Sequence, residues 1–399
     1  MLHLANIYKI YGSPLEFDEK SLVTSSFSPH LTYLRNNALK ITNHENNKIE
    51  DIGNLSKTEI LLEYANELIL FTGNQFISVE LQNEIATCLI DVGFFYQNAG
   101  LEMLQRAYDT PTDNDSSWTT SGSYLKKGLG ILEFLKIIIP NFMNPRLFER
   151  LSEMIVEFKL IQQLGILILS LTKLKKKLSN DASSELDLHS NDLKKASAAS
   201  TFYAKLAIGC HETCIQLKKG RLVNSGLTDY LEGLTYLLLS MDQYRKDECG
   251  VAIGMLEQCI NSFSKIVPRS KLTTTILSTP KLKVKPLNKI SHSFKSTVLK
   301  TKQKSERTLN IEDSKRKLIP VLNDTLDNFL IPLISLLNYV YNHNNDKLYF
   351  QSVIRDENEL KRLKPQGKSP QLESIPWYIN NGKIEEYKEN ATSSTNDLF

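Results

Sequence analysis

The sequence predicts an all-α protein, and three observations support that fold class. Apolar residues recur every three or four positions through most of the 399 residues, which is the spacing of one face of an α-helix. Runs that alternate apolar and polar residues, as half-buried strands do, are scarce. The composition, 41% hydrophobic and 23% charged, is typical of a globular chain with a sizeable core.

The expected helices follow one another along the chain. Three apolar stripes define helices over 60–71, 85–96 and 151–161. One segment with some strand-like alternation, 4–17, predicts a small β element at the N-terminus. Further helices are expected near 121–139, 193–219, 227–245, 247–267 and 316–342. The stripes consist of Ile60, Leu61, Tyr64, Leu68 and Phe71; Ile85, Leu89, Val92, Phe95 and Tyr96; and Leu151, Met154, Ile155, Phe158 and Ile161.

Polar breaks at 106–120, 176–192 and 268–314 interrupt these helices. Each break separates helices that we assign to one bundle, so we expect a single domain over residues 1–388 and a disordered tail over 389–399. The third break is far longer than ordinary helix connections. We therefore interpret 268–314 as a disordered, basic insert or as an inserted functional loop.

Charge is concentrated in this insert. From Arg269 to Lys317 there are 14 lysines and arginines against three acidic residues, a local net charge of 14 − 3 = +11. The whole chain carries +3, so the remainder carries 3 − 11 = −8. A segment of this kind can bind an anionic membrane surface. We assign membrane or anion contact to Lys281, Lys283, Lys285 and Lys289.

Two alternatives to membrane contact stay open for the insert. It can bind nucleic acid without sequence preference, or it can be a solvated loop that balances an acidic body. Phe294 is nearly the only aromatic residue available there for stacking on bases, which weakens the nucleic-acid interpretation. No specific nucleic-acid partner is therefore predicted.

Motifs that carry catalysis or bind metals are hard to find. The run GSYLKKGLG (122–130) does not match the GxxxxGK[ST] pattern of a phosphate-binding loop and follows no predicted strand, so we interpret its glycines as small residues at a close helix contact. In CHETC (210–214) a second histidine would have to stand at 215, where isoleucine occurs, so Cys210 and Cys214 are interpreted as core thiols. We predict no enzyme, no metal and no cofactor.

The cysteine count and the N-terminus bear on the compartment. Five cysteines, an odd number in a long chain without a signal peptide, indicate reduced thiols and no disulfide framework. The start, MLHLANIYKIYG, resembles no leader, and position 2 is leucine where myristoylation requires glycine. We therefore expect a cytoplasmic protein.

Six stretches, in chain order, carry a family resemblance. The most specific is ASTFYAKLAIGC (199–210), through its Ala-Lys-Leu-Ala core at 204–207. Taken together they resemble the Bro-domain family, the domain shared with Alix, and within it the fungal PalC proteins of ambient-pH signalling. The other stretches are IATCLIDVGFFYQNAG (85–100), SYLKKGLGILEFLK (123–136), MIVEFKLIQQLGIL (154–167), YRKDECGVAIGMLEQCI (244–260), and NDKLYFQSV (345–353) with SIPWYI (374–379).

The resemblance implies a boomerang-shaped helical solenoid with a tetratricopeptide-like core. It also implies a non-enzymatic adaptor that binds the C-terminal amphipathic helix of the filament-forming ESCRT-III subunit. In such helix-in-groove binding, apolar anchors enter the groove and charges at the rim fix the register. By position in the matching helices, Phe202 and Leu206 are the expected anchors, with Leu135 as a third. For each of these three residues, the alternative is that the side chain packs in the protein core and contacts no partner.

Chain length and resemblance together suggest a pathway. The adaptor would support proteolytic activation of the alkaline-pH-response transcription factor, acting indirectly with a separate complex that contains a calpain-like protease. Recruitment would be peripheral, to an endosomal or plasma membrane. The alternative is a membrane-associated trafficking scaffold attached through the insert 268–314, with ESCRT-III binding secondary.

Two details of the resemblance bear on single residues. The pair Gln162–Gln163 stands where larger apolar residues are usual in the family, which predicts a weaker part of the binding surface. Tyr349 and Phe350 fall in the packed extended segment that follows the last long helix, so both are predicted to be structural. Phosphorylation of Tyr349 is a further role that the resemblance suggests.

Overall fold

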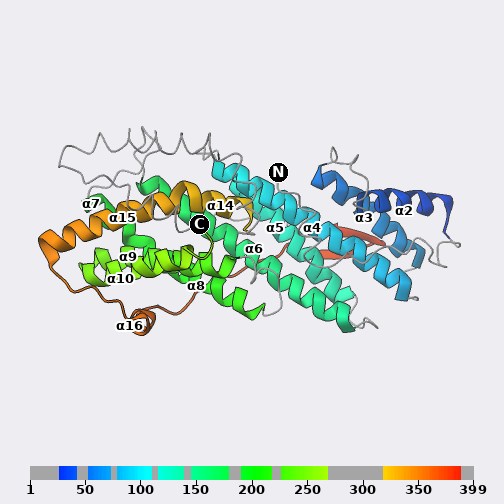
Figure 1. Ribbon diagram of the computed structural model, residues 1–399. Helices are drawn as coiled ribbons and strands as arrows, with labels where there is room; N and C mark the ends of the chain where they lie inside the picture. The colour runs from blue at the N-terminus through cyan, green and yellow to red at the C-terminus, as the bar shows by residue number, and fades with distance from the viewer. Residues whose placement is uncertain are drawn as a thin grey trace. The chain divides into compact units, whose positions relative to one another are not determined.

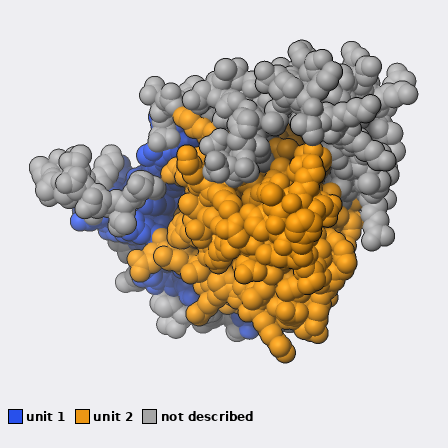
Figure 2. Space-filling model, turned by 90° about the vertical axis from the view of Figure 1, so that its left-hand side faces the viewer, with its two compact units in different colours: residues 1–162, 372–399 blue, residues 163–371 orange. Residues whose placement is uncertain are grey.

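A computed structural model shows the chain as two compact units, coloured separately in Figure 2. Unit 1 comprises residues 1–162 and 372–399, and unit 2 comprises residues 163–371. The prediction of a single domain over 1–388 stays a prediction. The structure describes residues 27–42, 53–72, 79–109, 116–138, 145–178, 190–217, 226–267 and 318–387.

The all-α prediction is confirmed, because the described residues form helices and one two-stranded sheet (Figure 1). The predicted strand region 4–17 and the insert 268–314 lie outside the described residues. The α-helices are α2 (Pro29–Thr42), α3 (Asn54–Thr72), α4 (Val79–Asp109), α5 (Ser116–Ile138), α6 (Pro145–Leu178), α7 (Ser190–Ala196), α8 (Ser200–Gln216), α9 (Leu227–Arg245), α10 (Cys249–Phe263), α14 (Pro320–Thr325), α15 (Ile331–Asn344) and α16 (Glu357–Arg362). A 3-10 turn, η2 (Ser197–Ala199), and two π-helical turns, η5 (Leu326–Leu330) and η6 (Asn345–Tyr349), join some of them; the strands are β1 (Trp377–Asn380) and β2 (Lys383–Glu386).

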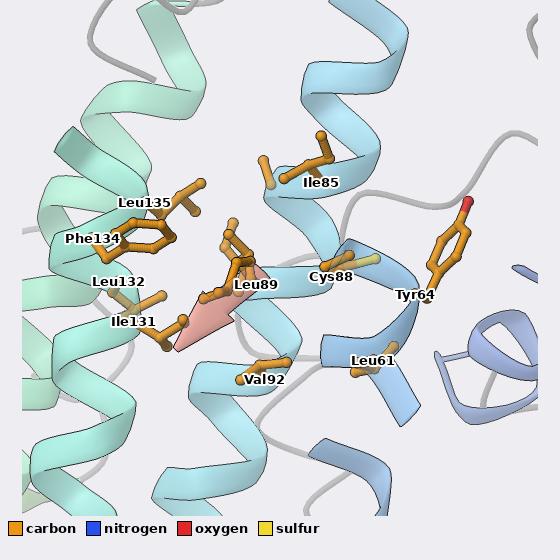
Figure 3. Close-up of a cluster of buried hydrophobic side chains, with 14 of the residues drawn as sticks. Leu61, Tyr64, Ile85, Cys88, Leu89, Val92, Ile131, Leu132, Phe134 and Leu135 are labelled. Atoms are coloured by element: carbon orange, nitrogen blue, oxygen red, sulfur yellow. The ribbon is translucent and has the colours of Figure 1, made fainter. Parts of the chain in front are cut away.

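In unit 1 each helix packs against its neighbour in sequence, α2 on α3, α3 on α4 and α4 on α5. Serial packing of this kind is typical of helical solenoids. Helices α4 and α5 approach closely because a glycine of α5, Gly128, would carry its Cβ only 2.8 Å from the carbonyl oxygen of Gly93 on α4. The small-residue interpretation of 122–130 is therefore confirmed at Gly128. Figure 3 shows the apolar side chains, Ile85 and Leu89 among them, that fill this core.

A buried ion pair joins α2, α3 and α4. The Arg35 guanidinium lies 2.7 Å from a carboxylate oxygen of Glu84, and both side chains are almost entirely buried. The same carboxylate oxygen accepts a hydrogen bond from the hydroxyl of Tyr64, which is fully buried. Burial raises the pKa of Tyr64, so the phenol stays protonated and keeps donating. The three side chains therefore tie three helices together through one carboxylate.

Helix α4 also holds a carboxylate that has no hydrogen-bond partner. Asp91 is 1% exposed, and neither of its side-chain oxygens makes a hydrogen bond. Burial raises the pKa of Asp91 to about 8, because a charge in an apolar interior is poorly solvated. The carboxyl group is thus neutral through most of the acidic and neutral pH range, at a cost to stability considered in the Discussion.

The sheet of unit 1 is a hairpin closed by Asn381 and Gly382. Both residues have positive φ, 49° and 79°, and an Asn-Gly pair is the preferred sequence for such a two-residue turn. The strands pair antiparallel, with Ile379 opposite Ile384. Trp377 anchors the hairpin, since its ring is 8% exposed and its Nε1–H donates to the carbonyl of Lys127 at 3.2 Å.

Unit 2 continues the pattern of neighbour packing. Helix α8 packs on α9 and α9 on α10, while α15 covers α10, as the left half of Figure 1 shows. The connection between α9 and α10 is short, and Asp247 takes a left-handed conformation there, with φ of 67°. The rings of Tyr244 and Tyr341 stack with centroids 4.6 Å apart, which fixes α15 against the end of α9. The predicted helix 193–219 is interrupted in the structure by η2.

The sequence boundary between the two units falls within helix α6, between Gln162 and Gln163. Its stretch Leu151–Leu178 is long and apolar enough to cross a membrane by length and composition, and 72% of its most apolar window is buried inside the structure. Buried core helices of globular proteins can be equally long and equally apolar. Gln162 and Gln163, in the middle of this helix, are buried and bonded: Gln162 donates to the carbonyl of Leu125 at 2.9 Å, and Gln163 accepts from the hydroxyl of Thr213 at 3.2 Å.

After η6 the chain runs back over the helices as an extended strap, residues 351–376, in which α16 is the single helical turn. In unit 2 the strap lies on α10, because a Cβ at Gly250 would overlap the carbonyl oxygen of Ser352 and a Cβ at Gly254 that of Ile354. In unit 1 it lies on α5, where a Cβ at Gly130 would overlap the carbonyl oxygen of Ile375. Helix glycines therefore form the seats of the strap.

Replacing Gly254 with alanine should destabilise the protein by about 1–3 kcal/mol, even though alanine favours helix, because the strap carbonyl must move away. The measurement is urea unfolding. The matched control is Gly122→Ala in α5, where a Cβ meets nothing within 4 Å and a gain of roughly 0.5–1 kcal/mol is expected. Equal stabilisation of both variants would contradict the close packing of the strap carbonyl against Gly254.

Candidate partner-binding surface on helix α8

Helix α8 is built from the stretch that carries the strongest family resemblance. Its inner face is apolar and small, with Tyr203, Ala204, Leu206, Ala207 and Cys210 buried. Small side chains let α9 approach closely, which explains why α8 and α9 pack along most of their length. The outer face carries Phe202, which is 46% exposed, together with half-buried Lys205 and exposed Glu212.

The three predicted anchors thus lie in different surroundings. Phe202 has the exposure that an anchor for a partner needs. Leu206, one turn later, is 3% exposed and belongs to the inner face of α8. Leu135 is fully buried in the core of unit 1, where Figure 3 shows it beside Phe134. For Leu206 and Leu135 the structure thus shows the core position that the sequence left open as the alternative.

The strap forms one border of the outer face. The backbone N–H of Lys368 donates to the carbonyl of Lys205 at 2.9 Å. A Cβ on Gly209 would lie 2.7 Å from the carbonyl oxygen of Lys368, so the strap again rests on a helix glycine. The Lys368 ammonium lies 5.5 Å from the centroid of the Phe202 ring, within reach of a cation–π interaction. Lys368 is a residue of this surface that sequence reasoning missed.

Charged groups from α9 and the strap gather next to this face. Lys364 lies 3.9 Å from the ring centroid of Tyr236 and 3.8 Å from a carboxylate oxygen of Glu232. Burial lowers the pKa of Lys364, and the carboxylate of Glu232 opposes that change. Burial likewise lowers the pKa of His211, so this imidazole on α8 is predominantly neutral near neutral pH. The border of the surface thus carries both signs of charge.

A second exposed apolar feature lies at the end of α15. Leu348 is 69% exposed and Phe350 is 76% exposed, and Phe350 has a left-handed backbone with φ of 53°, which is rare for a bulky residue. Asn345 holds this turn, because its side chain accepts from the N–H of Gln351 and donates to the Gln351 carbonyl. The prediction of a packed, structural role is therefore wrong for Phe350.

Tyr349 does have structural contacts. Its hydroxyl donates to a carboxylate oxygen of Asp247 at 2.6 Å, and the Lys194 ammonium lies 2.5 Å from the same oxygen. This hydrogen bond raises the pKa of Tyr349, with burial as the second cause. These contacts agree with a structural role for Tyr349, but the residue is partly exposed and lies in the turn η6, not in the packed extended segment that was predicted. Phosphorylation of Tyr349 stays a prediction.

Metal binding and thiol chemistry find no support among the residues that the structure describes. In that part of the chain no group of three or more His, Cys, Asp or Glu side chains is placed to hold a metal ion. Cys210 and Cys214 are buried, which confirms the core-thiol interpretation. Burial raises the pKa of the Cys214 thiol to about 12, so it is not a thiolate at neutral pH. Lys281, Lys283, Lys285 and Lys289 lie outside the described residues.

Comparisons with known proteins identify a family and chains that are similar to this one. A solved structure described as "Structure basis for endosomal targeting by the Bro1 domain" covers 92% of this chain and 87% of its own, with a TM-score of 0.42 and 15% sequence identity. "Uncharacterized protein YGR122W" of Saccharomyces cerevisiae (strain ATCC 204508 / S288c) is 37% identical over 98% of this chain and 97% of its own length. The model of the "Family of unknown function (DUF5355)" matches residues 79–399, and the chain therefore belongs to the DUF5355 family.

Proposed function

We propose that the protein is a non-enzymatic adaptor that binds an amphipathic helix on the outer face of α8, with Phe202 as the principal anchor. One observation carries the proposal: an aromatic side chain that is 46% exposed stands at the start of the helix with the most specific family resemblance. Exposed aromatic residues bordered by charged groups are the usual centres of protein-binding surfaces. The mixed charges of Lys205 and Glu212 would set the register of the bound helix.

The sequence resemblance supplies the identity of the partner. We assign the bound helix to the C-terminal segment of the filament-forming ESCRT-III subunit. The adaptor would bring to these filaments the machinery that activates the alkaline-pH-response transcription factor by proteolysis, through a complex with a calpain-like protease. It would act in the cytoplasm and at the surface of an endosomal or plasma membrane.

The structure changes which variant tests this function best. Leu206→Asp would place a carboxylate in the core and unfold the helix, whereas Phe202→Asp alters a side chain that is already exposed. Ile215→Asp is the matched control, since Ile215 is 49% exposed on the same helix and lies on a different side of it. Both substitutions introduce the same charge.

Titration of the full chain with the labelled C-terminal helical peptide of the ESCRT-III subunit should give saturable binding. Phe202→Asp should weaken it by at least about 30-fold, as expected for an aromatic hot spot worth 2 kcal/mol or more. Ile215→Asp should bind as wild type does, and both variants should unfold at the wild-type temperature. Equal affinity of all three proteins would reject Phe202 as the anchor; absence of wild-type binding would reject the proposed partner.

The charge of the insert favours a second candidate function. With a local net charge of +11, residues 269–317 can attach the protein to anionic lipid, which would make it a trafficking scaffold whose ESCRT-III binding is secondary. Deletion of 269–314 separates the two candidates in a co-sedimentation assay with vesicles that contain phosphatidylserine. Loss of vesicle binding with peptide binding intact favours the scaffold, and unchanged vesicle binding favours the adaptor alone.

A further inference from the structure

We propose that residues 363–371 form a displaceable cover over α8, so that the partner-binding surface exists in a covered and an open state. The cover is the part of the strap that crosses α9 and α8. The inference rests on the proposed function, because it assigns a regulation to the same surface.

The cover lies on the line that a bound helix would follow. Positions 202, 205, 209 and 212 form one stripe along α8, at the spacing of a helix face. Phe202 begins this stripe, and the cover occupies the other three positions. Lys368 bonds to the Lys205 carbonyl and rests on Gly209, while a Cβ on Gly367 would lie 2.6 Å from a carboxylate oxygen of Glu212. A partner helix longer than one turn therefore meets the cover directly after Phe202.

Only weak contacts hold the cover in place. Every residue from 361 to 371 is at least partly exposed, so the cover buries no apolar side chain. Among the described residues, the bond from Lys368 to Lys205 is the one backbone hydrogen bond between the cover and α8 or α9, while Leu363 and Lys364 at the start of the cover donate to carbonyls of α16. The other contacts include the cation–π and ionic interactions of Lys364 and Lys368, which are individually small, and the packing of Gly367 and Lys368 against α8. Segments with these properties open locally before the rest of a fold.

The strap upstream of the cover is held much more firmly. Leu360 is fully buried and lies against the seat formed by Gly254, where its Cδ1 would be 3.6 Å from an added Cβ. Further back, the side chain of Gln351 bonds both to the N–H of Gly250 and to the carbonyl of Asp247. The difference places a hinge just after the C-terminal end of α16, so the cover can move while Leu360 and the preceding strap stay in place.

Covering must lower the apparent affinity for a helix, in proportion to the fraction of molecules that are open. The double variant Lys364→Ala/Lys368→Ala removes the side-chain contacts of the cover without altering α8 itself. Gly209→Ala opens the cover independently, from the helix side, because the new Cβ would push against the Lys368 carbonyl. Lys195→Ala/Lys347→Ala is the control for lost charge, since both lysines are exposed and take no part in the cover.

The experiment combines amide hydrogen exchange of residues 363–371 with titration by the labelled ESCRT-III helical peptide, on the full chain. In both opening variants we expect faster exchange, and peptide binding about 3- to 10-fold tighter than in wild type. The control pair should match wild type in both measurements. Exchange needs no partner, so it reports the state of the cover whether or not the peptide binds.

The outcomes are distinct. Faster exchange with tighter binding in both variants supports the cover. Faster exchange with unchanged affinity overturns it, because the segment then opens without controlling the surface. Unchanged exchange in both variants overturns the claim that the contacts of Lys364, Lys368 and Gly209 hold the cover in place. If exchange is faster but the peptide binds none of the proteins, the proposed function is rejected. The proposed regulation is then rejected as well, because the surface has no such partner to regulate.

Discussion

Replacing Glu84 with alanine should destabilise the protein by about 3–5 kcal/mol, the largest effect we expect from a single substitution in unit 1. The variant leaves the guanidinium of Arg35 and the hydroxyl of Tyr64 buried without their shared carboxylate. The attraction within the pair matters less here than the cost of keeping the Arg35 charge buried after the Glu84 carboxylate has been removed. Urea unfolding followed by circular dichroism measures the change.

Two further variants separate the ion pair from ordinary packing. Glu63→Ala removes an exposed carboxylate from α3 and should change stability by less than about 0.5 kcal/mol. Arg35→Met/Glu84→Met removes both charges at similar volume and should recover much of the loss. If Glu84→Ala and the methionine pair are equally unstable, lost packing and not an unpaired charge is responsible.

Replacing Asp91 with asparagine should stabilise the protein, and more strongly as the pH rises. The folded state holds a proton on Asp91 up to a pKa of about 8, whereas a solvated aspartate releases it near pH 3.8. Between these values the unfolded chain binds fewer protons than the folded one, so wild-type stability falls with rising pH. Asparagine has nearly the same shape and no charge, so the variant escapes this loss.

The size of the effect follows from the same linkage. The stability difference between Asp91→Asn and wild type should grow by up to about 1.4 kcal/mol per pH unit from pH 5 to pH 7, and level off above pH 8. Urea unfolding at pH 5, 6, 7, 8 and 9 measures it. Asp109→Asn, an exposed carboxylate on the same helix, is the control and should show a small, flat difference. A flat profile for Asp91→Asn would mean that the buried carboxylate is ionised in the folded protein.

Helix periodicity predicted the central elements well, because α4, α9 and α10 each carry apolar residues at helical spacing over several turns. It located Ile85, Leu89 and Val92 in the core of unit 1, where Figure 3 shows them. The C-terminal hairpin was missed, although Asn381 and Gly382 are the strongest short hairpin signal that a sequence can carry. Two four-residue strands on either side were too short for an alternating pattern to stand out.

The anchors on α8 illustrate a limit of a different kind. Phe202, Tyr203 and Leu206 are all apolar and lie close together, so the sequence does not show which of the three side chains is exposed, although Lys205 and Glu212 mark the outer face further along the helix. Which of them is exposed depends on where α9 and the strap lie, and the strap is more than 150 residues away in the sequence. An isolated glycine in a helical stretch, such as Gly209, is the available signal that a backbone approaches there.

The division of the chain has a consequence for its synthesis. Unit 1 combines residues 1–162 with residues 372–399, so the Trp377 anchor and the hairpin emerge only after unit 2 has been translated. At roughly 5–20 residues per second, the intervening segment keeps the ribosome occupied for roughly 10–40 seconds. During that time the part of α5 that contacts Ile375 and Trp377 stays uncovered. A nascent chain stalled near residue 370 should therefore be a substrate for chaperones, and a late premature stop codon should damage the half of the protein made first.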